Sequence, residues 1–232
     1  MNSMHSILRI AAPCFTAGHR HARPALPSAT IGIVPSVITP AEHDLLVSLC
    51  HRKLKRSAFL AAHFDKVISG YREMSASHWK VGVPASVAEE NERQVRAILC
   101  KCYAVLDRVR QDARDGGEGK MVNMEGNTKW SLETGGWLAE HILELNETGT
   151  IGAHVDHLTA SGTLVAALSL ISSTPVVFQH VEHPEWTVEI QAEPGSLYFQ
   201  MNDFRYDFTH AVPKPAGQPR ISVMFRDQYV RQ

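Results

Sequence analysis

Long apolar runs are the first thing that this 232-residue chain lacks, since none approaches the roughly 18 consecutive apolar residues that a membrane-spanning helix needs. We therefore expect no membrane span. Neither sign of charge dominates, because 23 lysine and arginine residues stand against 24 aspartate and glutamate residues, for a formal net charge of -1. This balance gives the protein as a whole no attraction to nucleic acid, although a local basic stripe is compatible with it.

Cysteine is also scarce. The four cysteines include one close pair, Cys100 and Cys102, which falls in a predicted helix where residues two apart point to different faces. A disulfide or a cysteine-based metal site is therefore not expected, and the thiols are predicted to be reduced.

Acidic residues are absent ahead of Glu42, where Arg9, Arg20 and Arg23 stand among serine, alanine and proline. A basic, serine-containing segment of this kind is typical of a mitochondrial transit peptide. Residues 1–30 are therefore predicted to direct the protein to the mitochondrial matrix, and the alternative is a disordered tail with no targeting role. Residues 31–232 suffice for a single domain with a full core and are few for two.

Two helices are predicted ahead of a β-rich half. Thr39 and Glu42 form a capping box around Pro40, and the helix that begins there ends in the basic stretch 51–56, which suits the negative end of a helix dipole. A nucleic-acid-binding patch is the alternative reading of that stretch. The second helix begins near Ser86, and its apolar residues recur at helical spacing as one buried stripe: Val95, Ile98, Leu99, Cys102, Leu106 and Val109.

From Trp137 onward the pattern changes to short β-rich runs that glycine and proline separate. Eight strands are predicted, at 137–145, 150–155, 163–171, 175–181, 186–192, 196–201, 205–211 and 220–226. The fold class is therefore mainly β with flanking helices, and eight short strands after two helices favour a jelly-roll barrel.

The most informative motif is His154-Val155-Asp156, which is followed much later by His210. Residues two apart on a strand project from the same face, so His154 and Asp156 can hold one metal ion, and a distant strand can add His210. Two imidazoles and one carboxylate leave the opposite coordination positions open. This is the ligand set of the non-haem Fe(II) oxygenases.

A second pattern concerns Arg220, Ser222 and Arg226, which share one face if residues 220–226 form a strand. Two arginines that enter a barrel need an anion to neutralise them, because unpaired buried charge is expensive. A small dicarboxylate supplies two carboxylate groups. We interpret that ligand as 2-oxoglutarate.

These motifs resemble the AlkB family of Fe(II)- and 2-oxoglutarate-dependent dioxygenases, and within it a mitochondrial branch. Further segments carry the resemblance, which covers roughly residues 36–226: 63–73 with Trp79, 141–145, 193–198 and 205–210. The resemblance implies a double-stranded β-helix as the dioxygenase core, with Fe(II) as the metal and 2-oxoglutarate and O2 as cosubstrates.

By position, the resemblance makes His154, Asp156 and His210 the catalytic iron ligands. It also assigns residues to the cosubstrate. Arg220 would pair with the distal carboxylate of 2-oxoglutarate, with help from Ser222 and from a hydrogen bond of Tyr198, and Arg226 would approach the end nearer the metal. A guanidinium group suits a carboxylate better than an ammonium group does, because it binds both oxygens.

Two departures from the family pattern weigh against nucleic-acid substrates. Members that repair nucleic acids carry an Asn-x-Tyr pair upstream of the metal motif, where this chain has Leu143-Glu144-Leu145. The connection 211–219 is also short, which leaves little room for an insertion that grips a substrate. DNA is therefore not expected as a substrate.

Three functions follow. The first is a mitochondrial dioxygenase that hydroxylates a protein or a metabolite, with the role in fatty acid metabolism and regulated necrotic cell death that the resemblance implies. The second is a demethylase of methylated mitochondrial RNA, which a basic groove with stacked aromatic residues at the iron site would favour. The third is a non-catalytic metal-binding barrel. Arg205 and Tyr206 are read equally as substrate contacts and as structural packing.

Overall fold

The computed structural model describes residues 8–9, 31–115, 120–122, 128–131, 136–213 and 217–228. The predicted transit peptide, residues 1–30, lies outside the described residues except for β1 (Leu8–Arg9), which pairs with β2 (Ile31–Val34). Its targeting role stays a prediction. In the described part of the chain, no helix is long and apolar enough to cross a membrane.

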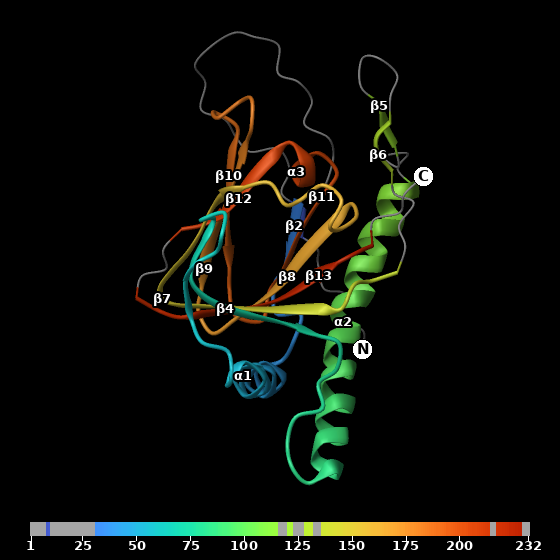
Figure 1. Ribbon diagram of the computed structural model, residues 1–232. Coiled ribbons are helices and arrows are strands. Elements are labelled where there is room, and N and C mark those ends of the chain that lie inside the picture. Colours follow the sequence, from blue (N-terminus) through green and yellow to red (C-terminus); the bar gives the residue numbers. More distant parts are fainter. Residues whose placement is uncertain are drawn as a thin grey trace.

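The core is one large antiparallel sheet that curves into a barrel-like shape (Figure 1). After β1 and β2 its order continues with β11 (Leu197–Met201), β8 (Leu164–Leu170), β13 (Arg220–Arg226), β7 (Glu140–His154), β12 (Phe208–Val212), β9 (Thr174–His180) and β10 (Thr187–Ala192). Apart from the pairs β1–β2 and β9–β10, strands that follow each other in the sequence are separated in this order, so the chain crosses repeatedly between the walls of the barrel. The prediction of a mainly β fold with flanking helices is confirmed.

The long strand β7 organises the barrel because it changes partners along its length. Its first half lies between β13 and β4 (Ile68–Ala76), and Leu145 faces both Arg220 and Tyr71. Its last residue, His154, instead faces β12. β4 in turn pairs with the short β3 (Leu60–Ala62), which closes a hairpin beside the end of β7.

Glycines allow this change of partners. A Cβ atom at Gly149 would lie 2.6 Å from the carbonyl oxygen of Gly70, and Gly70 itself has a φ of +56° in the left-handed region. The pairing of β4 with β7 shifts register between Ser69 and Tyr71, as at a β-bulge, which bends a strand without ending it. The prediction of two separate strands, 137–145 and 150–155, is therefore wrong, since Gly149 lies in one continuous strand.

Both predicted helices are present on the outside of the barrel (Figure 1). In α1 (Pro40–Leu54) the capping box forms, with the Glu42 N–H donating to Thr39 Oγ1 at 3.3 Å and the Thr39 N–H donating to Glu42 Oε2 at 2.9 Å. α2 (Ala85–Asp115) runs past the predicted end at residue 109, and the apolar stripe is confirmed, because all six of its members are buried. Cys50 and Cys102 are buried free thiols, and Cys100 is an exposed one.

Some elements differ from the sequence prediction. Residues 203–206, partly predicted as strand, form the short helix α3 (Asp203–Tyr206), so β12 begins only at Phe208. The strands β2, β3 and β4 were not predicted, and neither was the separate pair β5 (Lys120–Val122) and β6 (Thr128–Ser131). The remaining predicted strands agree with β8 to β11 and β13 to within one residue at each end.

Two apolar clusters fill the molecule. One lies where α1 and α2 cover the sheet, and it includes Leu46, Trp79 and Leu99. The other contains Tyr71, Leu143, Leu145, Phe178 and Phe208, which come from β4, β7, β9 and β12. The second cluster supports the candidate site, because two of these four strands, β7 and β12, carry His154 and His210.

Candidate metal centre

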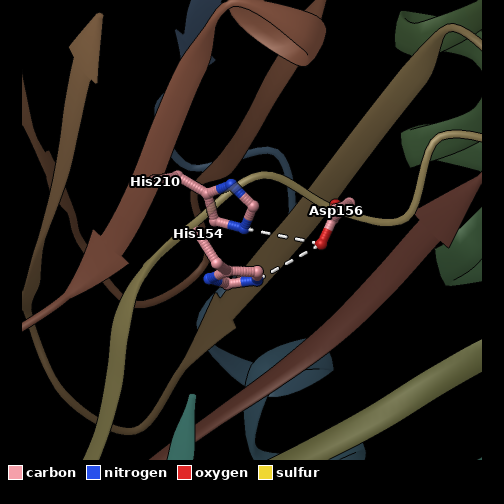
Figure 2. A group of neighbouring side chains, drawn as sticks. All are labelled: His154, Asp156 and His210. Atoms are coloured by element: carbon pink, nitrogen blue, oxygen red, sulfur yellow. Dashed lines mark ion pairs between the residues drawn. The ribbon is translucent and has the colours of Figure 1, made fainter. Parts of the chain in front are cut away.

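The three residues predicted to bind a metal come together at one end of the barrel. His154 ends β7, and His210 lies on β12 directly opposite His154 in the antiparallel register. Their ring centroids are 4.2 Å apart. Asp156 approaches both rings, with its Oδ1 atom 3.3 Å from His154 Nε2 and 3.8 Å from His210 Nε2 (Figure 2).

This group fits a divalent metal ion. One ligand atom from each residue lies within 4.8 Å of the other two, and the second carboxylate oxygen of Asp156, Oδ2, is buried without a hydrogen-bond partner in the described part of the chain. A buried carboxylate oxygen needs a partner, and a cation would provide one. The expectation that His154 and Asp156 share one strand is wrong, since β7 ends at His154 and Asp156 lies in the following loop.

Metal binding requires neutral imidazoles and an ionised carboxylate, so the pKa shifts of His210 and Asp156 suit it, and the shift of His154 opposes it. Burial lowers the pKa of His210 to about 4, against the opposing charge of Asp156. Burial would raise the pKa of Asp156, but the hydrogen bond with His154 and the positive potential of His210 and Arg205 outweigh it and lower that pKa. For His154, burial lowers the pKa, and the contacts with Asp156 and the Gly152 carbonyl reverse this and raise it.

Hydrogen bonds to the far side of each ring orient the imidazoles. His154 Nδ1 lies 2.9 Å from the carbonyl oxygen of Gly152 and donates its N–H there, so Nε2, the nitrogen that faces Asp156, is the ring atom that a metal would bind. His210 Nδ1 lies 3.3 Å from Gln200 Nε2, and Gln200 Oε1 is buried without a described partner. Turning the Gln200 amide would let Oε1 accept from Nδ1 and would leave Nε2 of His210 free to bind a metal.

A second polar group contains three of the residues predicted to hold the cosubstrate. Arg220 is 1% exposed, and its guanidinium donates to Tyr198 Oη at 3.2 Å and to Ser222 Oγ at 3.4 Å. Both partners are neutral hydroxyls, and Arg220 Nε has no partner among the described residues. A buried guanidinium with only hydroxyl partners is suited to an anion that would neutralise it. The Arg220 charge also helps to lower the pKa of His210, so it acts within reach of the metal-ligand group.

Arg226 is placed less decisively. It ends β13, opposite Val165 of β8, and its charge contributes to lowering the pKa of Glu73 on β4, after the larger effect of the hydrogen bond from His141. Within the described residues, no hydrogen bond joins Arg226 to His154, Asp156 or His210. The role of Arg226 toward the metal end of the cosubstrate stays a prediction.

The sequence did not point to two residues beside the metal ligands. Gln200 contacts His210, and the only available signal was its position two residues after Tyr198, on the same face of β11. The sequence analysis read Arg205 equally as a substrate contact and as structural packing. The structure shows that it donates hydrogen bonds to the loop that carries Asp156. The sequence also predicts His157, His180 and His183 as solvated residues, and His157 and His183 are exposed at turns, whereas His180 is half-buried and packs against Trp186 and Phe208.

Comparison with known proteins supports the predicted resemblance. No family model matches the chain. The chain is 28% identical over 203 residues to proteins named alpha-ketoglutarate-dependent dioxygenase alkB homolog 7, mitochondrial, from Bos taurus and Mus musculus, with 83% of this chain and 76% of each relative covered. The resemblance to the AlkB family and its mitochondrial branch is therefore confirmed.

Solved structures support the fold. A Pseudomonas putida prolyl-4-hydroxylase matches with a TM-score of 0.54 at 12% identity, over 87% of this chain and 94% of that one. The structure of OsALKBH1 matches with a TM-score of 0.52 at 16% identity, over 90% of this chain and 99% of that one. The predicted jelly-roll core is therefore confirmed as the fold.

If His154, Asp156 and His210 form a metal site, Asp156→Ala is expected to lower the affinity for Mn(II), a redox-stable substitute for Fe(II), by more than about 100-fold, because losing a direct ligand exceeds the usual loss from an outer partner. Calorimetric titration of the metal-free protein measures this. Asp44→Ala is the matched control, since Asp44 lies outside the three-residue group and pairs with His43 on α1. Equal affinity in the wild type and in Asp156→Ala would contradict the assignment.

Proposed function

We propose that this chain, a relative of the AlkB homolog 7 proteins, is an Fe(II)- and 2-oxoglutarate-dependent dioxygenase. One observation carries the proposal: a two-histidine, one-carboxylate group and a buried arginine with hydroxyl partners belong to the same barrel, in which only Asp156 lies in a loop and not on a strand. Neither group alone would specify this chemistry. Together they match a metal that keeps open positions and a cosubstrate with a carboxylate at its far end.

His154, Asp156 and His210 would hold the iron. When bound, the iron supplies oxidation of a substrate C–H bond by O2, coupled to decarboxylation of 2-oxoglutarate to succinate and CO2. The residues of the chain contribute binding and orientation. Gly152 and Gln200 fix the two rings from behind, so that both Nε2 atoms are directed at Asp156 (Figure 2).

Arg220 would bind the distal carboxylate of 2-oxoglutarate. Its guanidinium is planar and can donate to both carboxylate oxygens, while Ser222 and Tyr198 keep it in place from the same strand and from β11. The other end of the cosubstrate would then lie toward the metal, where Arg226 is the second predicted contact. Leu143 and Leu145, both buried in the second apolar cluster, stand at the positions where the resemblance implies polar residues in members that repair nucleic acids.

The surroundings of the metal-ligand group favour a protein or an apolar metabolite as substrate. Leu158 is 55% exposed and follows Asp156 by two residues. Val181 is 56% exposed, and its N–H donates to the carbonyl oxygen of Asp207, the residue before β12. Phe64 is 90% exposed in the turn between β3 and β4. This turn is bonded to β7, because the Gly152 N–H donates to the Val67 carbonyl oxygen. Three exposed apolar side chains on segments next to the ligands suit an apolar substrate surface.

Charge on the same segments gives less support to RNA. The turn between β3 and β4 carries Asp65 beside Lys66, and the turn between β9 and β10 carries Glu182 and Glu185. An RNA groove needs a continuous row of basic residues. One observation favours RNA as the second candidate: His183 and Trp186 stack with their centroids 4.3 Å apart, and such a pair can also stack on a base.

The finer parts of the proposal rest on the relatives and on the N-terminal composition. The relatives are named as mitochondrial, and residues 1–30 have the composition of a transit peptide, so we place the protein in the mitochondrial matrix. The resemblance extends the proposal to a role in fatty acid metabolism and regulated necrotic cell death. A non-catalytic metal-binding barrel is the least supported alternative, since a group suited to a metal and a buried arginine suited to an anion occur in one barrel.

The enzymatic proposal predicts slow conversion of 2-oxoglutarate to succinate by the purified protein with Fe(II) and ascorbate, even before a substrate is added. Proton NMR of succinate measures the rate. Asp156→Ala is expected to reduce this rate to background, because the metal is no longer held. The absence of both turnover and metal-dependent 2-oxoglutarate binding in the wild type would overturn the proposal.

The cosubstrate assignment predicts that Arg220→Lys lowers the affinity for 2-oxoglutarate by about 10- to 100-fold, since one charge-assisted hydrogen bond of the guanidinium pair is lost. Affinity for Mn(II) measured without 2-oxoglutarate should not change, because Arg220 is not a ligand. Titration of the Mn(II)-loaded protein tests both statements. Wild-type 2-oxoglutarate affinity in Arg220→Lys would show that the anion binds elsewhere.

The substrate proposal predicts that cells lacking the gene lose a hydroxylation on a mitochondrial protein or metabolite, while methylation of mitochondrial RNA stays constant. Mass spectrometry of both fractions measures this. The wild-type gene should restore the hydroxylation and the Asp156→Ala gene should not. A rise in RNA methylation with unchanged hydroxylation would instead support the RNA demethylase.

A further inference from the structure

Arg205 ties together the two segments that supply the metal ligands. It lies on α3, is 1% exposed, and precedes the ligand His210 by five residues. Its guanidinium donates to the carbonyl oxygen of Asp156 at 3.1 Å and to that of His157 at 3.0 Å. A third bond reaches Ser161 Oγ at 3.1 Å. All three acceptors belong to the loop between β7 and β8.

This loop has no regular secondary structure of its own at Asp156, so its conformation depends on such contacts. Farther along, the Gly162 N–H donates to the Asp227 carbonyl at 2.8 Å, and Tyr206 Oη donates to the Gly162 carbonyl at 3.4 Å. These bonds anchor the distal end of the loop. The contacts of Arg205 lie at the proximal end, at the ligand itself.

Arg205 binds the main chain of Asp156 and leaves its side chain available. A guanidinium that paired with the carboxylate would compete with a metal for the same oxygens. The carbonyl contacts avoid this competition, while the positive charge still favours ionised Asp156 and contributes to its lowered pKa. Arg205 therefore orients Asp156 and favours its ionised form, and the carboxylate oxygens stay available to a metal.

We propose that Arg205 is a positioning residue that holds the Asp156–Ser161 loop in its metal-binding conformation before the metal arrives. The inference rests on the proposed function, in that Asp156 must be a ligand. Preorganisation would raise metal affinity, because the loop would lose its conformational entropy during folding. The metal would then not have to order the loop when it binds.

Only arginine fits this position. Two adjacent carbonyl oxygens and a hydroxyl require donors that point in different directions from one planar group, and the guanidinium has five. Lysine keeps the charge but gathers its three donors on one nitrogen. Arg205→Lys therefore separates the geometry of the contact from its electrostatic effect.

The test compares Arg205→Lys with Arg72→Lys. Arg72 is a matched control, since it also pins a loop through main-chain carbonyls, those of Leu54 and Ser57, and it pairs with Glu144 away from the ligands. Three quantities are measured on the full-length protein: Mn(II) affinity, the thermal midpoint of the metal-free protein, and amide hydrogen exchange of residues 157–162.

Arg205→Lys is expected to lower Mn(II) affinity by about 10- to 100-fold, the range for residues that orient a ligand, and to speed amide exchange in the loop. Arg72→Lys is expected to lower the thermal midpoint and to leave Mn(II) affinity unchanged. Ser161→Ala is the milder second variant, since it removes a single acceptor, and a smaller loss of Mn(II) affinity is expected for it.

Two results would overturn the inference. Wild-type Mn(II) affinity and loop exchange in both Arg205→Lys and Ser161→Ala would show that the loop needs no such support. An equal loss of Mn(II) affinity in Arg72→Lys would show that general destabilisation explains the effect. The proposed function fails separately, if the wild type binds no Mn(II) or if Asp156→Ala binds it as well as the wild type does.

Discussion

The antiparallel register between β7 and β12 places His154 opposite His210, and the rest of the site depends on that alignment. A slip of one residue would turn His210 to the other face of β12 and remove it from the group. Apolar packing fixes the register. β12 also pairs with β9, where His210 faces Phe178, and Phe178 and Phe208 are buried in one cluster. The core therefore determines the position of the polar ligands.

Three buried or half-buried arginines have different roles, because the groups around their side chains differ. Arg205 is surrounded by neutral carbonyl oxygens and a hydroxyl, so its donors are used by the chain itself. Arg220 meets hydroxyls of Tyr198 and Ser222, which leaves its charge for an anionic ligand. Arg226 contributes a positive charge that helps to lower the pKa of Glu73 on β4. A buried arginine with hydroxyl partners, in the same barrel as two imidazoles and one carboxylate, suits a protein that takes up both a dicarboxylate and a cation.

The elements predicted correctly are those with a clear pattern of apolar residues, either alternating along a strand or repeating at helical spacing. The run 220–226 alternates and became β13 with the predicted bounds, and the stripe of α2 is buried as expected. β4 was missed because Gly70, Arg72 and Glu73 hide its pattern, and its strand conformation depends on pairing with β7. Asp156 was predicted on a strand and lies in a loop. The contacts of Arg205 and Gln200 link residues far apart in the chain, so no local pattern reveals them.

The central claim is that one barrel holds a metal on His154, Asp156 and His210 and a dicarboxylate on Arg220. A crystal structure of the protein with Mn(II) and 2-oxoglutarate tests it most directly. The account predicts anomalous density for manganese within bonding distance of all three side chains, with the distal carboxylate of 2-oxoglutarate bound to Arg220. Manganese on other residues, or a 2-oxoglutarate carboxylate that does not contact Arg220, would contradict it.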